Sequence, residues 1–170
     1  MNRLIIFFIV LLAAMTRLIP HPPNFTPIIA IGLVSGAYIS NRYFCFFIPI
    51  CAMFISDIFL GFHNLIYWVY GSLLLIPLLG ILLKSKVNIV NCILGCASGS
   101  IIFFIITNFG VWISSSYYPK TIEGILTCYT MALPFFANTL TSSLLYSAII
   151  FSGSEYIVRK QSEHTSKTIL

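Results

Sequence analysis

Long, uninterrupted apolar runs constrain this chain more than any other feature of its sequence. Residues 43–62, 65–83 and 87–109 are each apolar over about 20 positions, the length needed to cross the hydrocarbon core of a bilayer. Their apolar residues are continuous rather than alternating, which favours helices over the strands of a membrane barrel. With 59% hydrophobic residues, 8% charged residues and a mean hydropathy of +1.00, the chain is too apolar for a soluble domain.

Six apolar segments can be drawn: residues 4–15, 27–39, 43–62, 65–83, 87–109 and 125–151. We therefore predict an all-α, polytopic membrane bundle of about six transmembrane helices over residues 1–151, with a polar, loosely ordered tail over 152–170. Pro134 lies inside the sixth segment and is predicted to break or kink its helix. In an alternative interpretation the first segment is a cleaved signal peptide, which would leave five spans.

The distribution of cations predicts the orientation of these spans. With the N-terminus inside, the inner segments carry seven cations, namely Arg3, Arg42, Lys84, Lys86, Arg159, Lys160 and Lys167. The outer segments carry only Arg17 and Lys120. Cytoplasmic loops of membrane proteins are enriched in Lys and Arg, so both termini are predicted to be cytoplasmic. The expected location is a bacterial inner membrane, crossed several times.

Polar and aromatic side chains gather in the connections that this topology places outside. The inner connections at 40–43 and 83–88 are plain, whereas the outer ones at 17–27, 56–64 and 107–124 are rich in polar and aromatic groups. The first of these reads RLIPHPPNFTP and contains four prolines. Proline fixes the backbone, and a stiff polar segment presents side chains at little entropic cost. Function is therefore expected at the outer face, although a segment that only reverses the chain is the simpler alternative.

Asp57 is the one acidic residue within a predicted span. A carboxylate in hydrocarbon is costly, so Asp57 should face protein or water and have a partner, with Arg17 and His21 as the nearest candidates. Such a group either contacts a ligand or ion, or forms a structural ion pair. An enzyme that uses Asp57 with His63 is a further alternative, which requires the helix to end at Gly61 so that the two side chains can meet.

Several amides and rings complete the candidate site. Asn24 belongs to the first outer segment, although Asn24 and Thr26 could instead cap the helix that follows. Asn108 and Trp112 lie one helical turn apart, and Trp112 could equally be an interfacial anchor. Asn138 lies within the sixth segment, where an amide binds either another helix or a ligand.

The sequence predicts no metal, no cofactor and no nucleic-acid partner. It has no Walker A sequence, no G-x-S-x-G and no metal-ligand cluster, and Cys92 and Cys96 are best explained as small buried side chains. Two small-residue motifs, Gly32-xxx-Gly36 and Gly95-xxx-Gly99, permit close helix contact. Packing inside the protein is the simpler use of these motifs, and docking onto a partner subunit is the alternative.

The motifs RLIPHPPNFTPI, SDIFLGFH, VYGS, TNFGVW, YPKTIEGILTCY and PFFANTL resemble those of a family of uncharacterised six-helix bacterial membrane proteins. That family is similar to the substrate-binding S components of energy-coupling-factor (ECF) transporters. The resemblance implies a helical bundle that captures a vitamin-like molecule at the outer face and docks onto a coupling transmembrane subunit and ATPase subunits. The Met-x-His metal site of some S components is absent, so the implied substrate is organic.

These observations predict a substrate-binding membrane subunit rather than an enzyme. The expected substrate-binding residues are Arg17, His21, Asn24, Asp57, His63, Asn108, Trp112 and Asn138. The alternative of a different class is a structural or assembly protein of the membrane, in which the outer polar residues only satisfy one another.

Overall fold

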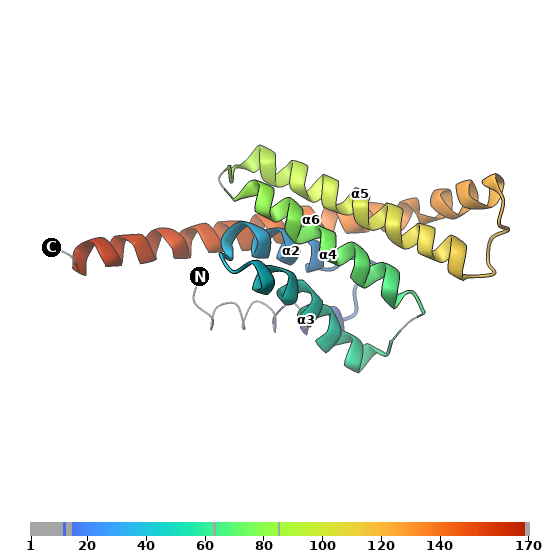
Figure 1. Cartoon of the computed structure of the whole chain (residues 1–170), viewed down its shortest axis with the longest axis horizontal. Helices are drawn as coiled ribbons and strands as arrows, with labels where there is room; N and C mark the ends of the chain where they lie inside the picture. The colour runs from blue at the N-terminus through green and yellow to red at the C-terminus, as the bar shows by residue number, and fades with distance from the viewer. Residues whose placement is uncertain (1–11, 13–14, 63, 85, 169–170) are drawn as a thin grey trace.

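The computed structural model describes residues 12, 15–62, 64–84 and 86–168, with side chains as far as Tyr156. This part of the chain is helical (Figure 1), and after a helical turn at residues 15–18 it forms α2 (Ile28–Tyr38), α3 (Arg42–Leu60), α4 (Ile66–Leu83), α5 (Ile89–Ser114) and α6 (Ile122–Thr168). Four of these helices, α3, α4, α5 and residues 122–156 of α6, are long and apolar enough to cross a membrane. The prediction of an all-α bundle with several helices able to span a membrane is therefore confirmed, with four such helices in the described part of the chain.

The apolar segments predicted from residue 27 onward correspond to α2–α6, whereas most of the segment at 4–15 falls outside the described residues. The structure corrects two details of these predictions. The sixth helix is continuous through Pro134, so the proline does not break it, and a kink there stays a prediction. The same helix continues to Thr168 instead of ending in a loosely ordered tail. Neighbouring α5 packs along α6, and such packing tolerates a proline inside a membrane helix.

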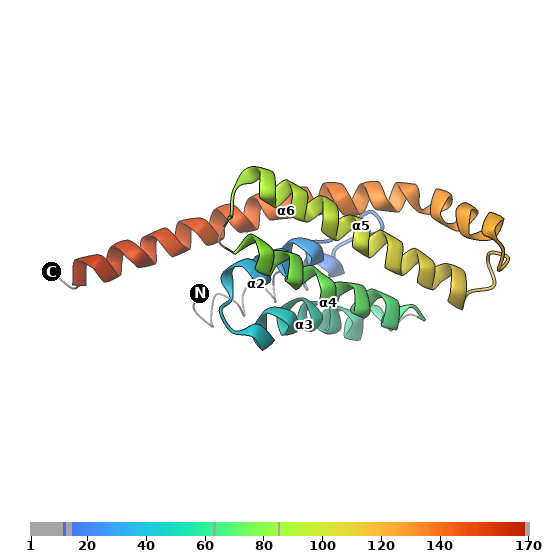
Figure 2. The ribbon, with the colours of Figure 1, turned by 45° about the horizontal axis from the view of Figure 1, so that its top comes forward.

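The long helices alternate in direction, so their connections gather at two opposite ends of the bundle. Figures 1 and 2 show the α3–α4 and α5–α6 connections at one end, and the α2–α3 and α4–α5 connections at the other. The polar connections at 61–65 and 115–121 thus share one end, as the predicted topology requires. The C-terminal part of α6 extends from the opposite end.

Helix α2 lies at the centre of the bundle, in contact with α3, α4, α5 and α6. Its 11 residues span only about 16 Å at 1.5 Å per residue, too short to cross a bilayer. Ten of them are buried, from Ile28 through Ala37. The chain before α2 therefore has to enter the bundle, and the RLIPHPPNFTP segment passes from exposed positions at 19–24 to the buried Pro27.

The small-residue motifs allow the close approach of α2 to its neighbours. A Cβ atom at Gly36 would lie 2.9 Å from the carbonyl carbon of Gly80 on α4, and one at Gly32 would lie 2.8 Å from Cγ2 of Ile76. A Cβ at Gly99 would lie 3.1 Å from Cγ2 of Ile29. Packing inside the protein, the simpler interpretation of these motifs, is therefore confirmed.

Side chains satisfy the backbone groups that the helix ends and prolines leave open. Asn41 accepts hydrogen bonds from the amides of Tyr43 and Phe44 and so begins α3. Pro49 has no amide hydrogen for the carbonyl of Cys45, and the hydroxyl of Ser35 on α2 donates to that carbonyl at 2.8 Å. The proline in α3 is thus compensated by a contact that also holds α2 in place.

Candidate functional site

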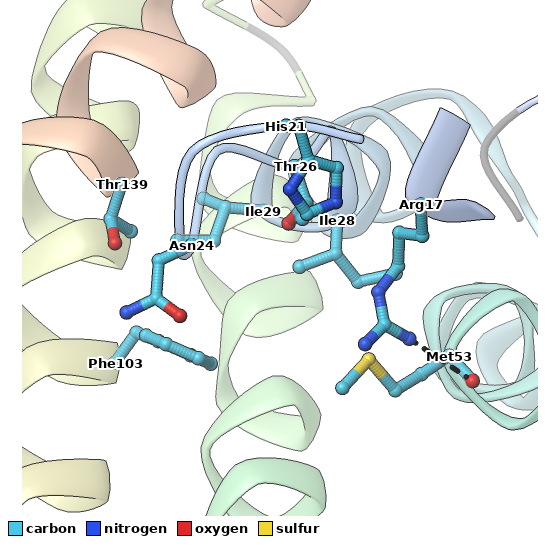
Figure 3. A pocket seen from close by; sticks show the side chains of 9 residues that line it. All are labelled: Arg17, His21, Asn24, Thr26, Ile28, Ile29, Met53, Phe103 and Thr139. Atoms are coloured by element: carbon cyan, nitrogen blue, oxygen red, sulfur yellow. Dashed lines mark hydrogen bonds between the residues drawn. The ribbon is translucent and has the colours of Figure 1, made fainter. Parts of the chain in front are cut away.

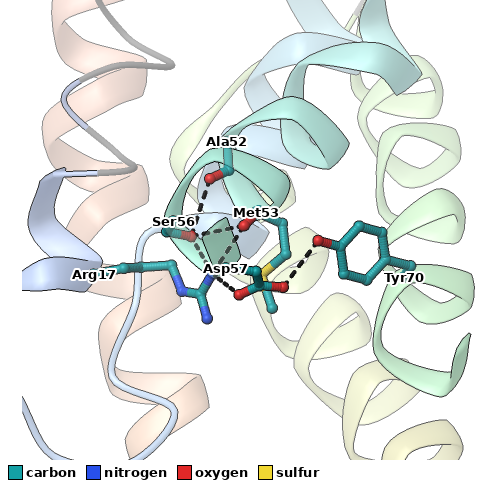
Figure 4. A network of polar contacts seen from close by, with 6 residues as sticks. All are labelled: Arg17, Ala52, Met53, Ser56, Asp57 and Tyr70. Carbon is teal, nitrogen blue, oxygen red and sulfur yellow. Dashed lines mark hydrogen bonds and ion pairs between the residues drawn. The ribbon is translucent and has the colours of Figure 1, made fainter. Parts of the chain in front are cut away.

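An ion pair between Arg17 and Asp57 lies at the centre of the candidate site. Nη1 of Arg17 is 2.9 Å from Oδ1 of Asp57, whose side chain is only 1% exposed (Figure 4). Asp57 lies one turn before the end of α3, and Arg17 lies in the helical turn that precedes the RLIPHPPNFTP prolines. The prediction that Asp57 has a partner, with Arg17 as a candidate, is confirmed.

Further contacts fix the geometry of both charged groups. Oδ2 of Asp57 accepts a hydrogen bond of 2.9 Å from the hydroxyl of Tyr70 on α4. Nη1 of Arg17 also donates to the hydroxyl of Ser56 and, at 3.3 Å, to the carbonyl of Met53. Both carboxylate oxygens are thus occupied, and the network ties the N-terminal segment to α3 and α4. Its formal charges cancel, which lowers the cost of placing them inside an apolar bundle.

One edge of the guanidinium remains available. Among the described residues, all hydrogen bonds of Arg17 come from Nη1, so Nε and Nη2 have no partner there. Figure 3 shows the second terminal nitrogen turned toward the hollow between Ile28 and Phe103. This hollow is a cavity of about 110 Å³ lined by Arg17, His21, Asn24, Thr26, Ile28, Ile29, Met53, Phe103 and Thr139. A fixed guanidinium therefore presents hydrogen-bond donors to the cavity.

A larger cavity adjoins the first. It measures about 390 Å³ and is lined by Pro23, Asn24, Leu65, Val69, Phe103, Thr107, Asn108, Val111, Tyr118, Cys128, Met131, Ala132 and Phe135. Asn24 and Phe103 line both cavities, and we call the two together the Arg17 chamber. The chamber is mostly apolar with a few amides, hydroxyls and one guanidinium, the composition typical of small-molecule sites.

The chamber contains four of the predicted substrate-binding residues, Arg17, His21, Asn24 and Asn108. Asp57 lies behind Arg17 and does not line either cavity. His63 lies outside the described residues. Gly61 has φ of 88° and ends α3, as an enzyme using Asp57 and His63 would require, but both oxygens of Asp57 already have partners.

The two other predicted residues hold parts of the structure together beside the chamber. Nδ2 of Asn138 on α6 donates to the carbonyl of Pro23 at 3.0 Å, which fixes the loop that forms one wall of the chamber. Nε1 of Trp112 donates to the carbonyl of Pro119, and Nζ of Lys120 lies 5.6 Å from the ring centre. Trp112 thus stabilises the α5–α6 connection.

The alternative role of Asn24 and Thr26 as caps of α2 is wrong. The residue that precedes α2 is Pro27, and no side chain caps this helix end. Asn24 instead adopts φ of 62° in a tight turn, in which the amide of Phe25 donates to the carbonyl of Pro22 at 3.0 Å. The Asn24 side chain is therefore directed to the chamber rather than to the helix end (Figure 3).

Comparison with known sequences assigns the chain to a family. The sequence model of DUF6580, described as a family of unknown function, matches residues 1–166. The chain belongs to the DUF6580 family. No curated protein and no solved structure matches it.

Sequence reasoning missed several residues of this DUF6580 chain that complete the site. Tyr70 is the second partner of Asp57, and Phe103 and Thr139 line the chamber. The sequence does contain a signal for Tyr70. Its hydroxyl lies in an apolar segment that directly follows the one with Asp57, and a buried carboxylate needs such a partner. Phe103 and Thr139 have no such signal, since similar residues occur throughout α5 and α6.

Proposed function

We propose that this DUF6580 protein binds a small organic molecule in the Arg17 chamber. The observation that carries the proposal is the guanidinium of Arg17, which Asp57, Ser56 and Met53 hold in place while its other edge faces the cavity. Donors that face a cavity and have no protein partner favour an occupant with an acceptor, such as a carbonyl group.

The charge of the site favours an uncharged molecule. Arg17 is already neutralised by Asp57, and no acidic side chain lines the described parts of the chamber. The amides of Asn24 and Asn108 offer both donors and acceptors, and Phe103, Phe135 and Tyr118 offer ring surfaces. The favoured occupant is a vitamin-sized molecule with a carbonyl group, polar edges and an apolar ring or chain.

We further propose that binding serves uptake, with this chain as the substrate-binding subunit of an ECF-type transporter. The support is the resemblance of the RLIPHPPNFTPI and SDIFLGFH motifs, together with the lack of any ATPase motif in the sequence. In this proposal the chain acts as a binding protein rather than as an enzyme. Its partners are a coupling transmembrane subunit and ATPase subunits.

The experiment is a purification from the native cells under mild solubilisation, with mass spectrometry of co-purifying proteins and small molecules. We expect a small organic molecule at near-equimolar amount and an ATPase pair with a coupling subunit. Recovery of a bound small molecule without ATPase subunits would support the binding role and contradict the ECF role. Recovery of the protein with no small molecule and no ATPase subunits would contradict both roles and support a structural role.

A further inference from the structure

A further cavity lies at the opposite end of the bundle, away from the Arg17 chamber. It measures about 780 Å³ and is lined by Tyr38, Val87, Asn88, Ile89, Cys92, Ile93, Cys96, Leu144, Ser147, Ala148, Phe151, Ser152 and Glu155. We call it the Cys96 cavity. Most of its lining belongs to α5 and α6, the same two helices that supply much of the wall of the Arg17 chamber. Figures 1 and 2 show these helices side by side over most of their length.

A row of hydroxyl and thiol groups connects the two cavities along the contact between α5 and α6. On α6 it comprises Thr139, Ser143 and Ser147, which are four residues apart and therefore lie on one face of the helix. On α5 the groups that face them are Cys96 and Ser100. Thr139 lines the Arg17 chamber, and Ser147 and Cys96 line the Cys96 cavity. The row thus begins in one cavity and ends in the other.

Between the cavities a thin layer remains. Its centre is the contact between the hydroxyls of Ser100 and Ser143, which are 3.0 Å apart and fully buried. Gly99 lies beside this pair, and a Cβ there would be 3.1 Å from Ile29, which lines the Arg17 chamber. Thr139 and Ser147 lie at the two ends of the α6 row and are separated by about 12 Å along the helix, so the barrier is about two helical turns thick.

We propose that the contact between α5 and α6 is the route by which an uncharged solute bound in the Arg17 chamber crosses the bundle, with Ser100 and Ser143 as its gate. The proposal rests on the proposed binding function. Small polar residues also serve close helix packing, but packing alone does not place a cavity at each end of the row. Thr139, Ser143, Ser147 and Ser100 carry no formal charge, so the route suits a neutral polar solute.

The gate has few hydrogen bonds to break. Across the barrier the described side-chain bonds are the Ser100–Ser143 pair and the contacts of the Cys96 thiol with the carbonyl of Ser143, at 3.5 Å, and with the hydroxyl of Ser147, at 3.1 Å. Ser143 also donates to the carbonyl of Leu140 on its own helix. The Ser143 hydroxyl therefore keeps a partner when α5 and α6 separate, whereas the Ser100 hydroxyl, which donates to it, has to find a new acceptor, such as the passing solute.

Cysteine accessibility tests the route without knowledge of the solute. All five natural cysteines are replaced by alanine, and Thr139→Cys, Ser143→Cys and Ser147→Cys are introduced one at a time. Sulfonatoethyl methanethiosulfonate, which is anionic and does not cross membranes, is applied to each face of membrane vesicles in turn. The control is Leu145→Cys, a residue of similar depth on α6 that is 52% exposed on the bundle surface.

We expect Thr139→Cys and Ser147→Cys to react from opposite faces, and Ser143→Cys to react from both, at least tenfold faster than Leu145→Cys. If Ser143→Cys reacts no faster than the control while Thr139→Cys still reacts, the proposed route is wrong, and the proposed binding function of the Arg17 chamber is not affected. If Thr139→Cys is also inert, the chamber has no access to water, and the route and the proposed binding function are both overturned.

Discussion

Replacement of Arg17 by alanine is expected to lower the free energy of unfolding by about 3–5 kcal/mol, because it leaves the carboxylate of Asp57 buried without its cation. Asp57 is 1% exposed, so water cannot replace the lost partner in the folded state. The measurement is unfolding of the purified protein in mixed micelles, followed by circular dichroism. The second substitution Asp57→Asn, added to Arg17→Ala, removes the unpaired charge and should recover most of the loss.

The matched control is Lys120→Ala, which removes an exposed cation from the α5–α6 connection. Nζ of Lys120 donates to the carbonyls of Trp112 and, at 2.7 Å, of Ser115, and exposed contacts of this kind are worth about 1 kcal/mol or less. If Arg17→Ala costs no more than Lys120→Ala, the ion pair does not hold the N-terminal segment against α3.

Replacement of Gly36 by alanine is the second substitution with a large expected effect. A Cβ at this position would lie 2.8 Å from the amide nitrogen of Ile81 and would also meet the carbonyl oxygen of Pro77, both in the backbone of α4. Helices α2 and α4 would have to separate, and overpacking of this kind costs about 1–3 kcal/mol. The same unfolding measurement gives the value.

Gly71→Ala is the control for this effect, since it makes the same change on α4 where a Cβ would meet nothing within 4 Å. Alanine is the better helix former, so Gly71→Ala should leave stability unchanged or raise it by up to about 1 kcal/mol. Equal losses for the two variants would mean that α2 and α4 do not pack as closely as described.

The helices from residue 27 onward could be predicted because apolar length alone identifies a membrane span. The break considered at Pro134 does not occur, because the effect of a proline depends on neighbouring helices that satisfy the backbone, and local sequence does not reveal them. The polar tail was misjudged for a similar reason, because α6 continues past the apolar stretch through Thr168.

The site was predicted in part. The cost of a buried carboxylate points to a partner for Asp57, and only a few cations lie near it in the expected topology. The walls of the chamber depend on which faces of α5 and α6 turn inward. In apolar helices every face is similar, so sequence gives no signal for Phe103 or Thr139. The RLIPHPPNFTP segment has to enter the bundle because α2 has only 11 residues, too few to cross a bilayer.

The most direct test of the account compares bound small molecules in the wild-type protein and in Arg17→Lys. Lysine keeps a cation next to Asp57, but its single ammonium group cannot also present the second edge of a guanidinium to the cavity. Arg42→Lys is the matched control, because it makes the same change in an exposed residue at the other end of the bundle. All three proteins are purified from native cells and measured by native mass spectrometry.

The account predicts that wild type and Arg42→Lys carry the same small molecule, and that its occupancy falls at least tenfold in Arg17→Lys while the unfolding midpoint stays within a few degrees. Equal occupancy in Arg17→Lys, or an empty chamber in the wild-type protein, would contradict the central claim that Arg17 presents its free edge to a ligand.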